Sequence, residues 1–157
     1  MIELLIAIFI IAISLIAIYG VTQTILSGAR VSIFRFKATY LAQEGIEIIR
    51  NIRDNNIISG NDWNAGFNLC NPHYNLFCEA DYNDLSLSPY ASPNEPRKLL
   101  FPGIFYNYSE GKPTNFTRKI TIDPVSEDRA DVLVEVIWED GDQEYNISLK
   151  TSLYDWQ

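Results

Sequence analysis

The first 54 residues carry two successive patterns of apolar and polar positions, and both are typical of an α-helix. Residues 4–21 (LLIAIFIIAISLIAIYGV) are apolar on nearly every side of a helix. Farther along, apolar residues recur every three or four positions and form one stripe, between faces that are charged. The stripe consists of Phe34, Ala38, Leu41, Gly45, Ile48 and Ile52. Because no proline occurs before Pro72, we expect one helix over residues 2–54.

The apolar run is long enough to act as a membrane segment. No charged residue occurs in residues 4–29, and the apolar core of the run approaches the roughly 20 residues that span a bilayer. A cleavable signal peptide is the alternative, but its apolar stretch is usually shorter and follows basic residues. We expect residues 1–29 to form a transmembrane half and residues 30–56 an amphipathic half. A helix of this length would measure roughly 80 Å against a hydrocarbon core of roughly 30 Å.

The pattern changes at the end of the predicted helix. Residues 54–115 contain eleven Asn, six Pro and four Gly, so long regular elements are not expected there. We interpret residues 57–115 as a loop-rich insertion. Its many aromatic residues predict that it folds onto a sheet. They are Trp63, Phe67, Tyr74, Phe77, Tyr82, Tyr90, Phe101, Phe105, Tyr106 and Tyr108.

Residues 116–157 show the alternation of an antiparallel sheet. With Asp140-Gly141 as a hairpin turn, one register gives an apolar face and a polar face. Its apolar pairs are Val132 with Leu149, Val134 with Ile147 and Val136 with Tyr145, and its polar pairs are Asp131 with Lys150 and Glu135 with Asn146. Residues 116–123 are predicted as a third strand. The apolar face is expected to pack on the helical stripe, which gives an α+β fold.

Charge separates the two ends of the chain. The net charge is −8, divided into +2 for residues 1–53 and −10 for residues 54–157. This acidic balance argues against nucleic acid as a partner. The basic residues after the apolar run would favour a cytoplasmic position for the C-terminal domain, whereas the cysteines favour the outside. A short basic leader before Met1 would remove this conflict.

Cys70 and Cys78 lie close together in the acidic, loop-rich region, and we expect a disulfide between them. Zinc is the alternative, with His73 as a third ligand, but no fourth ligand follows at a recognisable spacing.

The remaining candidate chemistry is sparse. Calcium is a second cofactor hypothesis, on residues 81–84 (DYND) or 140–142 (DGD), but neither cluster has EF-hand spacing and turn formation explains both. One histidine and no nucleophile or phosphate-loop motif predict a protein without enzymatic activity and without a resident cofactor.

The start of the chain, MIELLIAIFIIAIS, resembles the N-terminus of type IV pilins and of type II secretion pseudopilins. Two later segments, residues 41–56 (LAQEGIEIIRNIRDNN) and the C-terminal VLVEVIWEDG with LKTSLYDW, are similar to minor pilins and minor pseudopilins. The chain departs from the family because it has no leader with a terminal glycine, and only two residues precede the glutamate instead of four. We expect the true start to lie upstream of Met1.

The resemblance implies a function and assigns roles to residues. A prepilin peptidase would remove the leader, the new terminus would be methylated, and Glu3 would pair with the terminal amine of a neighbouring subunit. Glu3, Leu4, Ile8 and Ile11 are the expected assembly residues, and Phe34, Leu41, Ile48 and Ile52 the expected head-packing residues. Without the resemblance, Glu3 is equally well explained as an interfacial residue at the positive pole of the helix N-terminus.

We therefore expect a minor pilin that waits in the cytoplasmic membrane, with its C-terminal domain outside, and then enters an extracellular filament. Its partners would be other pilin subunits, the prepilin peptidase, the pilus or secretion assembly machinery and, before assembly, the lipid bilayer. Two alternatives stay open. One is a pseudopilin of a type II secretion system, and the other is a single-pass anchored module whose aromatic-rich loop binds a ligand.

Overall fold

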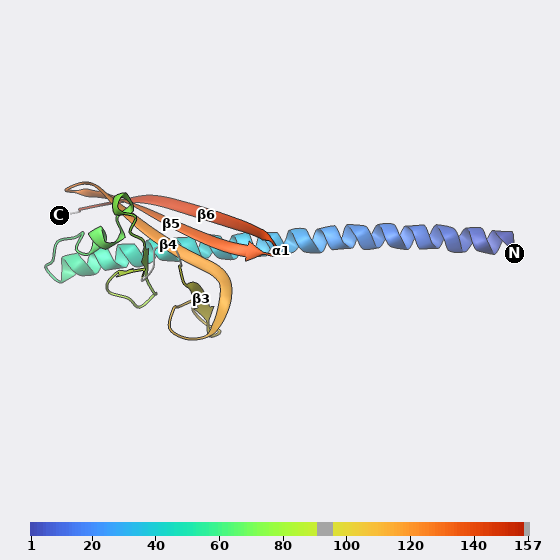
Figure 1. Ribbon diagram of the computed structural model, residues 1–157, viewed down its shortest axis with the longest axis horizontal. Helices are drawn as coiled ribbons and strands as arrows, with labels where there is room; N and C mark the ends of the chain where they lie inside the picture. The colour runs from blue at the N-terminus through green and yellow to red at the C-terminus, as the bar shows by residue number, and fades with distance from the viewer. Residues whose placement is uncertain (91–95, 156–157) are drawn as a thin grey trace. The chain divides into compact units, whose positions relative to one another are not determined.

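The computed structural model of the protein describes residues 1–90 and 96–155 (Figure 1). The α-helix found among these described residues, α1 (Ile2–Ile58), confirms the predicted helix and extends it by one turn. The chain forms two compact units, residues 1–36 and residues 37–157, which we call the N-terminal segment and the head. Helix α1 supplies the whole N-terminal segment and the first part of the head.

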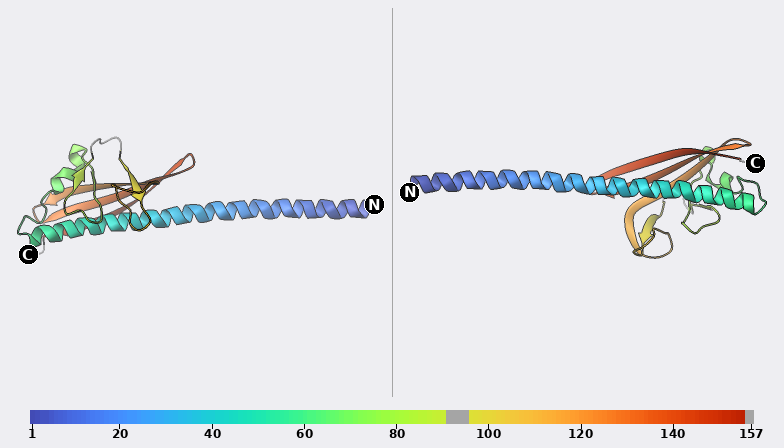
Figure 2. Two further views of the ribbon diagram at one scale, coloured as in Figure 1. Left: turned by 90° about the horizontal axis from the view of Figure 1, so that it is seen from below. Right: turned by 180° about the vertical axis from the view of Figure 1, so that it is seen from behind.

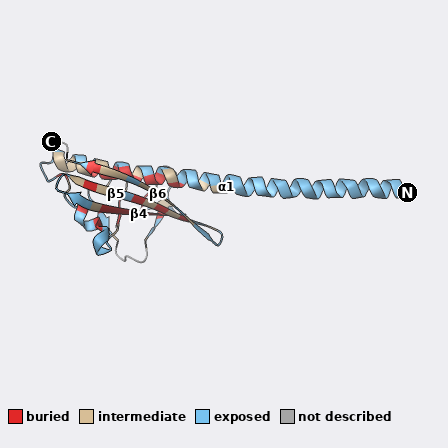
Figure 3. Ribbon diagram, turned by 90° about the horizontal axis from the view of Figure 1, so that it is seen from above, coloured by how far each residue is buried: buried red, intermediate tan, exposed pale blue. Residues whose placement is uncertain are grey.

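The N-terminal segment is helical and exposed along its whole length. Every large apolar side chain from Ile2 to Leu26 is more than half exposed. Figure 3 shows this contrast by colour, since the red, buried positions of α1 are confined to its second half. The segment has no proline to interrupt the helical hydrogen bonds, and its helical structure does not depend on burial of these side chains within the chain.

The head contains an antiparallel sheet built around three long strands. They are β4 (Lys112–Ser126), β5 (Arg129–Asp140) and β6 (Gln143–Tyr154), which follow one another as a meander. The sheet order is β2-β1-β4-β5-β6, where β1 is Cys78–Glu79 and β2 is Ser88–Pro89. Strand β3 (Lys98–Phe101) also pairs with β4. The α+β fold is thus as predicted.

Besides the end of α1 and the start of β4, the described residues of the expected loop-rich insertion contain only short elements. These are the 3₁₀ helices η1 (Phe67–Cys70) and η2 (Pro72–Tyr74) and strands β1 to β3. Strand β4 begins at Lys112, so the predicted third strand starts four residues earlier than expected and ends at Ser126. Three of the ten aromatic residues fold inward, since Trp63, Phe67 and Tyr108 are buried, whereas four others are exposed.

The core lies between one face of the sheet and α1 residues 38–52. Figure 2 shows this part of α1, coloured cyan to green, along one face of the sheet. Ala38, Ala42, Ile46 and Ile49 are buried in addition to members of the predicted stripe, so the packed face of the helix is wider than a single row. Opposite them, β5 contributes five alternate buried residues, Ala130, Val132, Val134, Val136 and Trp138.

The hairpin register differs from the sequence prediction by two residues. Strand β5 pairs Val134 with Leu149 and Val136 with Ile147, and the two-residue loop is Gly141-Asp142. Gly141 has φ +66°, and it occupies the first loop position, where a type II′ turn needs glycine. The predicted pairings were therefore wrong, but the faces were right because a shift of two residues keeps every side chain on its side. Trp156, which ends the quoted C-terminal motif, lies outside the described residues.

Candidate functional site

The expected assembly residues lie on the exposed part of α1. Glu3 is in the first turn of the helix, and Leu4, Ile8 and Ile11 follow at spacings of four and three, which places these three on one helical face. Leu4 is 65% exposed and the other two are exposed to a similar degree. The helix is long and apolar enough to cross a membrane, and none of its most apolar 18-residue window is buried within the protein.

The serine and threonine hydroxyl groups of the N-terminal segment bond to the helix itself. Each donates to a backbone carbonyl three or four residues earlier, at distances of 2.8 to 3.1 Å. The donors are Ser14, Thr22, Thr24, Ser27 and Ser32. These five hydroxyl donors can therefore enter an apolar environment already paired, and an unpaired donor in lipid would be costly.

The expected head-packing residues divide between the two units. Leu41, Ile48 and Ile52 are buried in the head. Phe34 belongs to the N-terminal segment, where it is half-buried and the Arg30 guanidinium lies 5.5 Å from the centre of its ring. Gly45 marks the close approach of helix and sheet, because a Cβ there would lie 2.8 Å from a methyl carbon of Val134.

A buried arginine that the sequence pattern did not single out joins the helix to the sheet. Arg118 lies in the helix-facing row of β4, beside Ile120, and its side chain is completely buried. Its Nη1 donates to Glu44 Oε2 at 3.0 Å and to the carbonyl of Leu41 at 3.2 Å, while Nη2 donates to the carbonyl of Ala80 at 2.6 Å. One side chain thus connects α1, β4 and the residue after β1.

Two tyrosine hydroxyls bind the backbone of the same arginine and extend this polar network. The hydroxyls of Tyr90 and Tyr108 both donate to the Arg118 carbonyl oxygen. Burial raises the pKa of the Tyr108 hydroxyl to about 12 and raises the pKa of Tyr90 as well, so both stay protonated donors. Nearby, Arg97 binds Glu79 through two nitrogens, at 2.5 to 3.1 Å.

Asp81 extends the network and is incompletely satisfied. Its Oδ2 accepts from the Tyr108 backbone N–H at 3.2 Å, whereas its Oδ1 is buried without a hydrogen-bond partner in the described part of the chain. Desolvation raises the pKa of this carboxyl, and the Tyr108 N–H opposes that effect. The Nε of Arg118 is likewise buried without a partner among the described residues. Most polar groups of the network are therefore hydrogen-bonded to one another, and the network acts as a structural joint between helix and sheet.

Cys70 and Cys78 form the predicted disulfide. The bond ties the end of η1 to β1, which pairs in turn with β4 at Ile120. His73 does not join the cysteines but lies 3.2 Å from Asp123. Because both sulfur atoms are used in the disulfide, these three residues do not provide the thiolate ligands of the zinc alternative.

The two acidic clusters considered for calcium act as turn residues. Asp84 Oδ2 accepts from the Asp81 N–H at 2.7 Å, which closes a local turn, and residues 140–142 contain the hairpin loop. Within the described ranges, no group of three or more His, Cys, Asp or Glu side chains could hold a metal ion.

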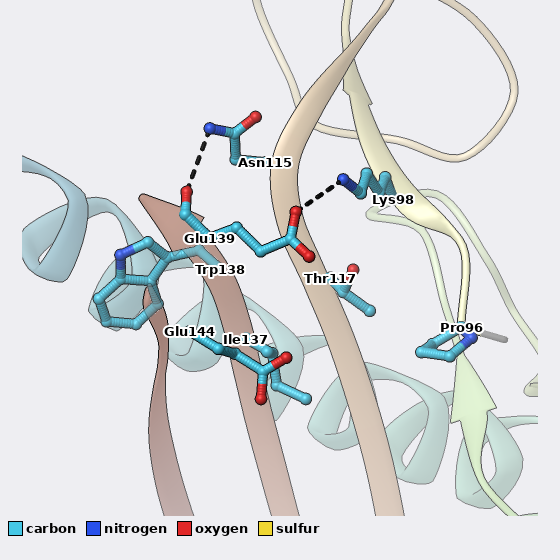
Figure 4. A pocket seen from close by; sticks show the side chains of 8 residues that line it. All are labelled: Pro96, Lys98, Asn115, Thr117, Ile137, Trp138, Glu139 and Glu144. Carbon is cyan, nitrogen blue, oxygen red and sulfur yellow. Dashed lines mark hydrogen bonds and ion pairs between the residues drawn. The ribbon is translucent and has the colours of Figure 1, made fainter. Parts of the chain in front are cut away.

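The outer face of the sheet, opposite α1, carries two hollows. One, of about 210 Å³, is lined by Pro72 and Phe77 above β4 and β5. The other, of about 220 Å³, lies between β3 and the end of β5 (Figure 4). There Lys98 Nζ is 3.3 Å from Glu139 Oε2, and Asn115 donates to the Glu139 carbonyl at 3.2 Å. Both interactions are exposed, one between two side chains and one from a side chain to the backbone, as on an ordinary solvated surface.

Comparison with known proteins adds no relative on which a function could rest: no family model matches the chain, no curated protein matches its sequence and no solved structure matches its fold.

Proposed function

We propose that this protein is a structural subunit, of the minor-pilin type, of a filament of the type IV pilus class. The observation that carries the proposal is the N-terminal segment. Its apolar side chains are exposed on every side of a helix that continues into a packed head. Burying one such side chain contributes about 1.5–3 kcal/mol, so a segment with this many strongly favours an apolar environment.

Two environments can cover this surface, and a filament subunit uses both. Lipid covers the segment while the subunit waits in the membrane, and the helices of neighbouring subunits replace lipid during assembly. The internally bonded hydroxyls suit either environment, since they need no donor or acceptor from outside the helix. In this proposal the head lies outside the cytoplasmic membrane, where an oxidising compartment maintains the disulfide.

The part of the aromatic set that is buried serves the core of the head and not an anchored ligand-binding module. The alternative relied on an aromatic-rich loop exposed to a ligand. Trp63, Phe67 and Tyr108 are core residues, whereas the exposed aromatic residues are Tyr74, Tyr82, Phe101 and Phe105. The Trp63 indole donates to the Glu127 carbonyl, and its ring meets Phe67 edge-on at 5.8 Å. These side chains hold the head together, and so we propose a structural and not a catalytic function.

Glu3 supplies the sharpest test. In the proposed filament its carboxylate neutralises the terminal amine of a neighbouring subunit within an apolar core, where an unpaired charge is costly. Glu3→Ala is expected to reduce recovery in sheared extracellular filaments by about tenfold or more, at an unchanged level in the membrane fraction. Glu47→Ala, at an exposed glutamate of α1 in the head, is the matched control and should assemble normally. Unchanged incorporation of the Glu3 variant would contradict the proposal.

A further inference from the structure

The two edges of the head sheet differ in a way that indicates a second interaction surface. Strand β6 is the last strand in the sheet order, and it pairs with β5 over twelve consecutive residue pairs without irregularity. On its other side, β6 has no partner strand among the described residues. At the opposite side of the sheet, β2 is two residues long and includes Pro89, and β3 has a register shift against β4. Only the β6 edge is long, regular and open.

The side chains of β6 are also incompletely covered. Tyr145, Ile147 and Leu149 point toward the same face as α1, yet they are only half-buried. On the outer face, Glu144 and Lys150 are exposed, as are the polar residues between them. An open row of backbone N–H and C=O groups beside half-covered apolar side chains is matched by another β-strand with the same alternation.

We propose that the β6 edge pairs with the β6 edge of a second copy of this chain, antiparallel, about a two-fold axis at Ile147. A two-fold axis perpendicular to the sheet keeps apolar residues opposite apolar ones, so Tyr145 faces Leu149 of the second copy. On the outer face the same register places Glu144 opposite Lys150 of the second copy, and the symmetry repeats this contact. Opposite charges directly across a strand pair stabilise it.

Charge and the apolar row together select this register over its two neighbours. With the axis at Ser148, Lys150 would face Asn146 and Glu144 would face Ser152, and both cross-strand ion pairs would be lost. With the axis at Asn146, Lys150 would face Asp142, which lies in the hairpin loop outside β6, and apolar Leu149 would face polar Gln143. Lys150 is available for the contact because its side chain is 63% exposed, although its Nζ already lies 2.9 Å from Asp131. The Lys150 ammonium group has three N–H donors, so it can bind the Asp131 carboxylate and the Glu144 carboxylate of the second copy at the same time.

This pairing is separate from the proposed function. The two-fold axis reverses the second head relative to the first, so the β6 contact joins two oppositely directed copies. Assembly through the N-terminal segment would instead place many copies in one direction. A variant that fails in one contact can therefore succeed in the other, and the Glu3 experiment does not decide this proposal.

Charge reversal tests the pairing in the full chain in detergent micelles. Glu144→Lys places like charges opposite each other twice and is expected to raise the dissociation constant of the dimer about tenfold or more. Lys150→Glu should act in the same way, and the double variant should restore dimerisation to within about threefold of the original chain. Glu110→Lys, at an exposed site before β4, is the control and should leave the dimer unchanged.

Cysteine cross-linking tests the register itself. Asn146 faces Ser148 of the second copy, at the Cα separation of a β-pair, which suits a disulfide. A mixture of Asn146→Cys and Ser148→Cys chains is expected to give a cross-linked heterodimer under mild oxidation, and more of it than either chain gives alone. The proposal is overturned if the chain is monomeric, if the dissociation constant of the dimer does not change with the charge at residue 144, or if cross-linking does not depend on mixing the two variants.

Discussion

The two halves of α1 are equally helical, but their apolar side chains differ in how far they are buried within the chain. In the head, residues such as Ile49 and Ile52 are almost fully buried against the sheet. In the N-terminal segment, Ile10 and Ile11 are more than half exposed although the helix is just as regular. The head thus contains its own core, whereas the N-terminal segment has apolar surface that only another molecule or a bilayer can cover.

This difference shows that the helix alone does not define a folded unit. Isolated helices in water gain little stability from propensity, and in proteins most helical stability comes from packing. The packed half has polar anchors in addition to apolar contacts, above all Arg118, which binds Glu44 and the Leu41 carbonyl. Substitutions in the head should therefore change its stability, and those in the N-terminal segment should leave it unchanged.

The largest effect is expected from breaking the buried joint. Arg118→Met removes the ion pair with Glu44 and leaves the carbonyls of Leu41 and Ala80 without this donor. We expect the free energy of unfolding of the head to fall by about 4 kcal/mol. Urea unfolding in detergent micelles, followed by tryptophan fluorescence, measures it. Arg50→Met, at a partly exposed site on α1, should cost less than about 0.5 kcal/mol, and equal losses for both variants would refute the assigned role.

A matched pair of isoleucine substitutions tests the comparison directly. Ile49→Ala deletes a completely buried side chain and should destabilise the head by about 3 kcal/mol, including the cost of the cavity. Ile10→Ala changes a residue that is 57% exposed and should leave head unfolding unchanged in the same assay. If Ile10→Ala destabilised the head as much as Ile49→Ala does, the two units would not be independent.

Removal of the disulfide should have a somewhat smaller effect that is confined to the head. The bond closes a short loop between Cys70 and Cys78, for which chain entropy predicts about 2.5 kcal/mol. We expect the double variant Cys70→Ala/Cys78→Ala to unfold at lower temperature in circular dichroism. Under reducing conditions, the unfolding temperature of the original chain should fall toward that of the variant. If the double variant unfolded at the same temperature as the oxidised original chain, the disulfide would not have the stabilising role assigned to it.

The smallest expected effect concerns acid stability. Hydrogen bonds from Lys150, Ser152 and Arg129 lower the pKa of the Asp131 carboxyl. A carboxyl with a lower pKa in the folded state stabilises the protein above its unfolded pKa of about 3.9, and this contribution is lost as pH falls through the lower folded value. Asp131→Asn should therefore reduce the melting temperature at pH 6 and have less effect near pH 2. Asp142→Asn, at the exposed hairpin loop, is the control, and equal pH profiles for both variants would contradict the prediction.

Periodicity in the sequence was sufficient for the helix and for the faces of the sheet. The spacing of Leu41, Ile48 and Ile52 located the packed side of α1, because a helical period leaves little choice of face. It was not sufficient for the hairpin register. An Asp-Gly pair is a strong turn signal, but glycine can occupy either central position of a two-residue loop, and the structure places Gly141 first.

The central joint could not be predicted from local patterns. Arg118 alternates along β4 with the buried residues Phe116 and Ile120, and this alternation was the one sequence signal that Arg118 is buried. The residues that Arg118 binds are distant in the sequence. Glu44 and Ala80 are 74 and 38 residues away. A buried charge depends on three-dimensional partners that periodicity does not encode. The short elements β1 to β3 were missed for a similar reason, since strands of two to four residues carry little pattern of their own.

The most direct test of the account is mass spectrometry of the N-terminal peptide from native cells, with sheared extracellular filaments compared against the membrane fraction. A filament subunit whose N-terminal segment exchanges lipid for neighbouring helices should occur in both fractions. In filaments we expect a processed, methylated terminus that begins upstream of Glu3. A protein found only in membranes, with an unprocessed terminus, would contradict the account and leave the N-terminal segment as a membrane anchor.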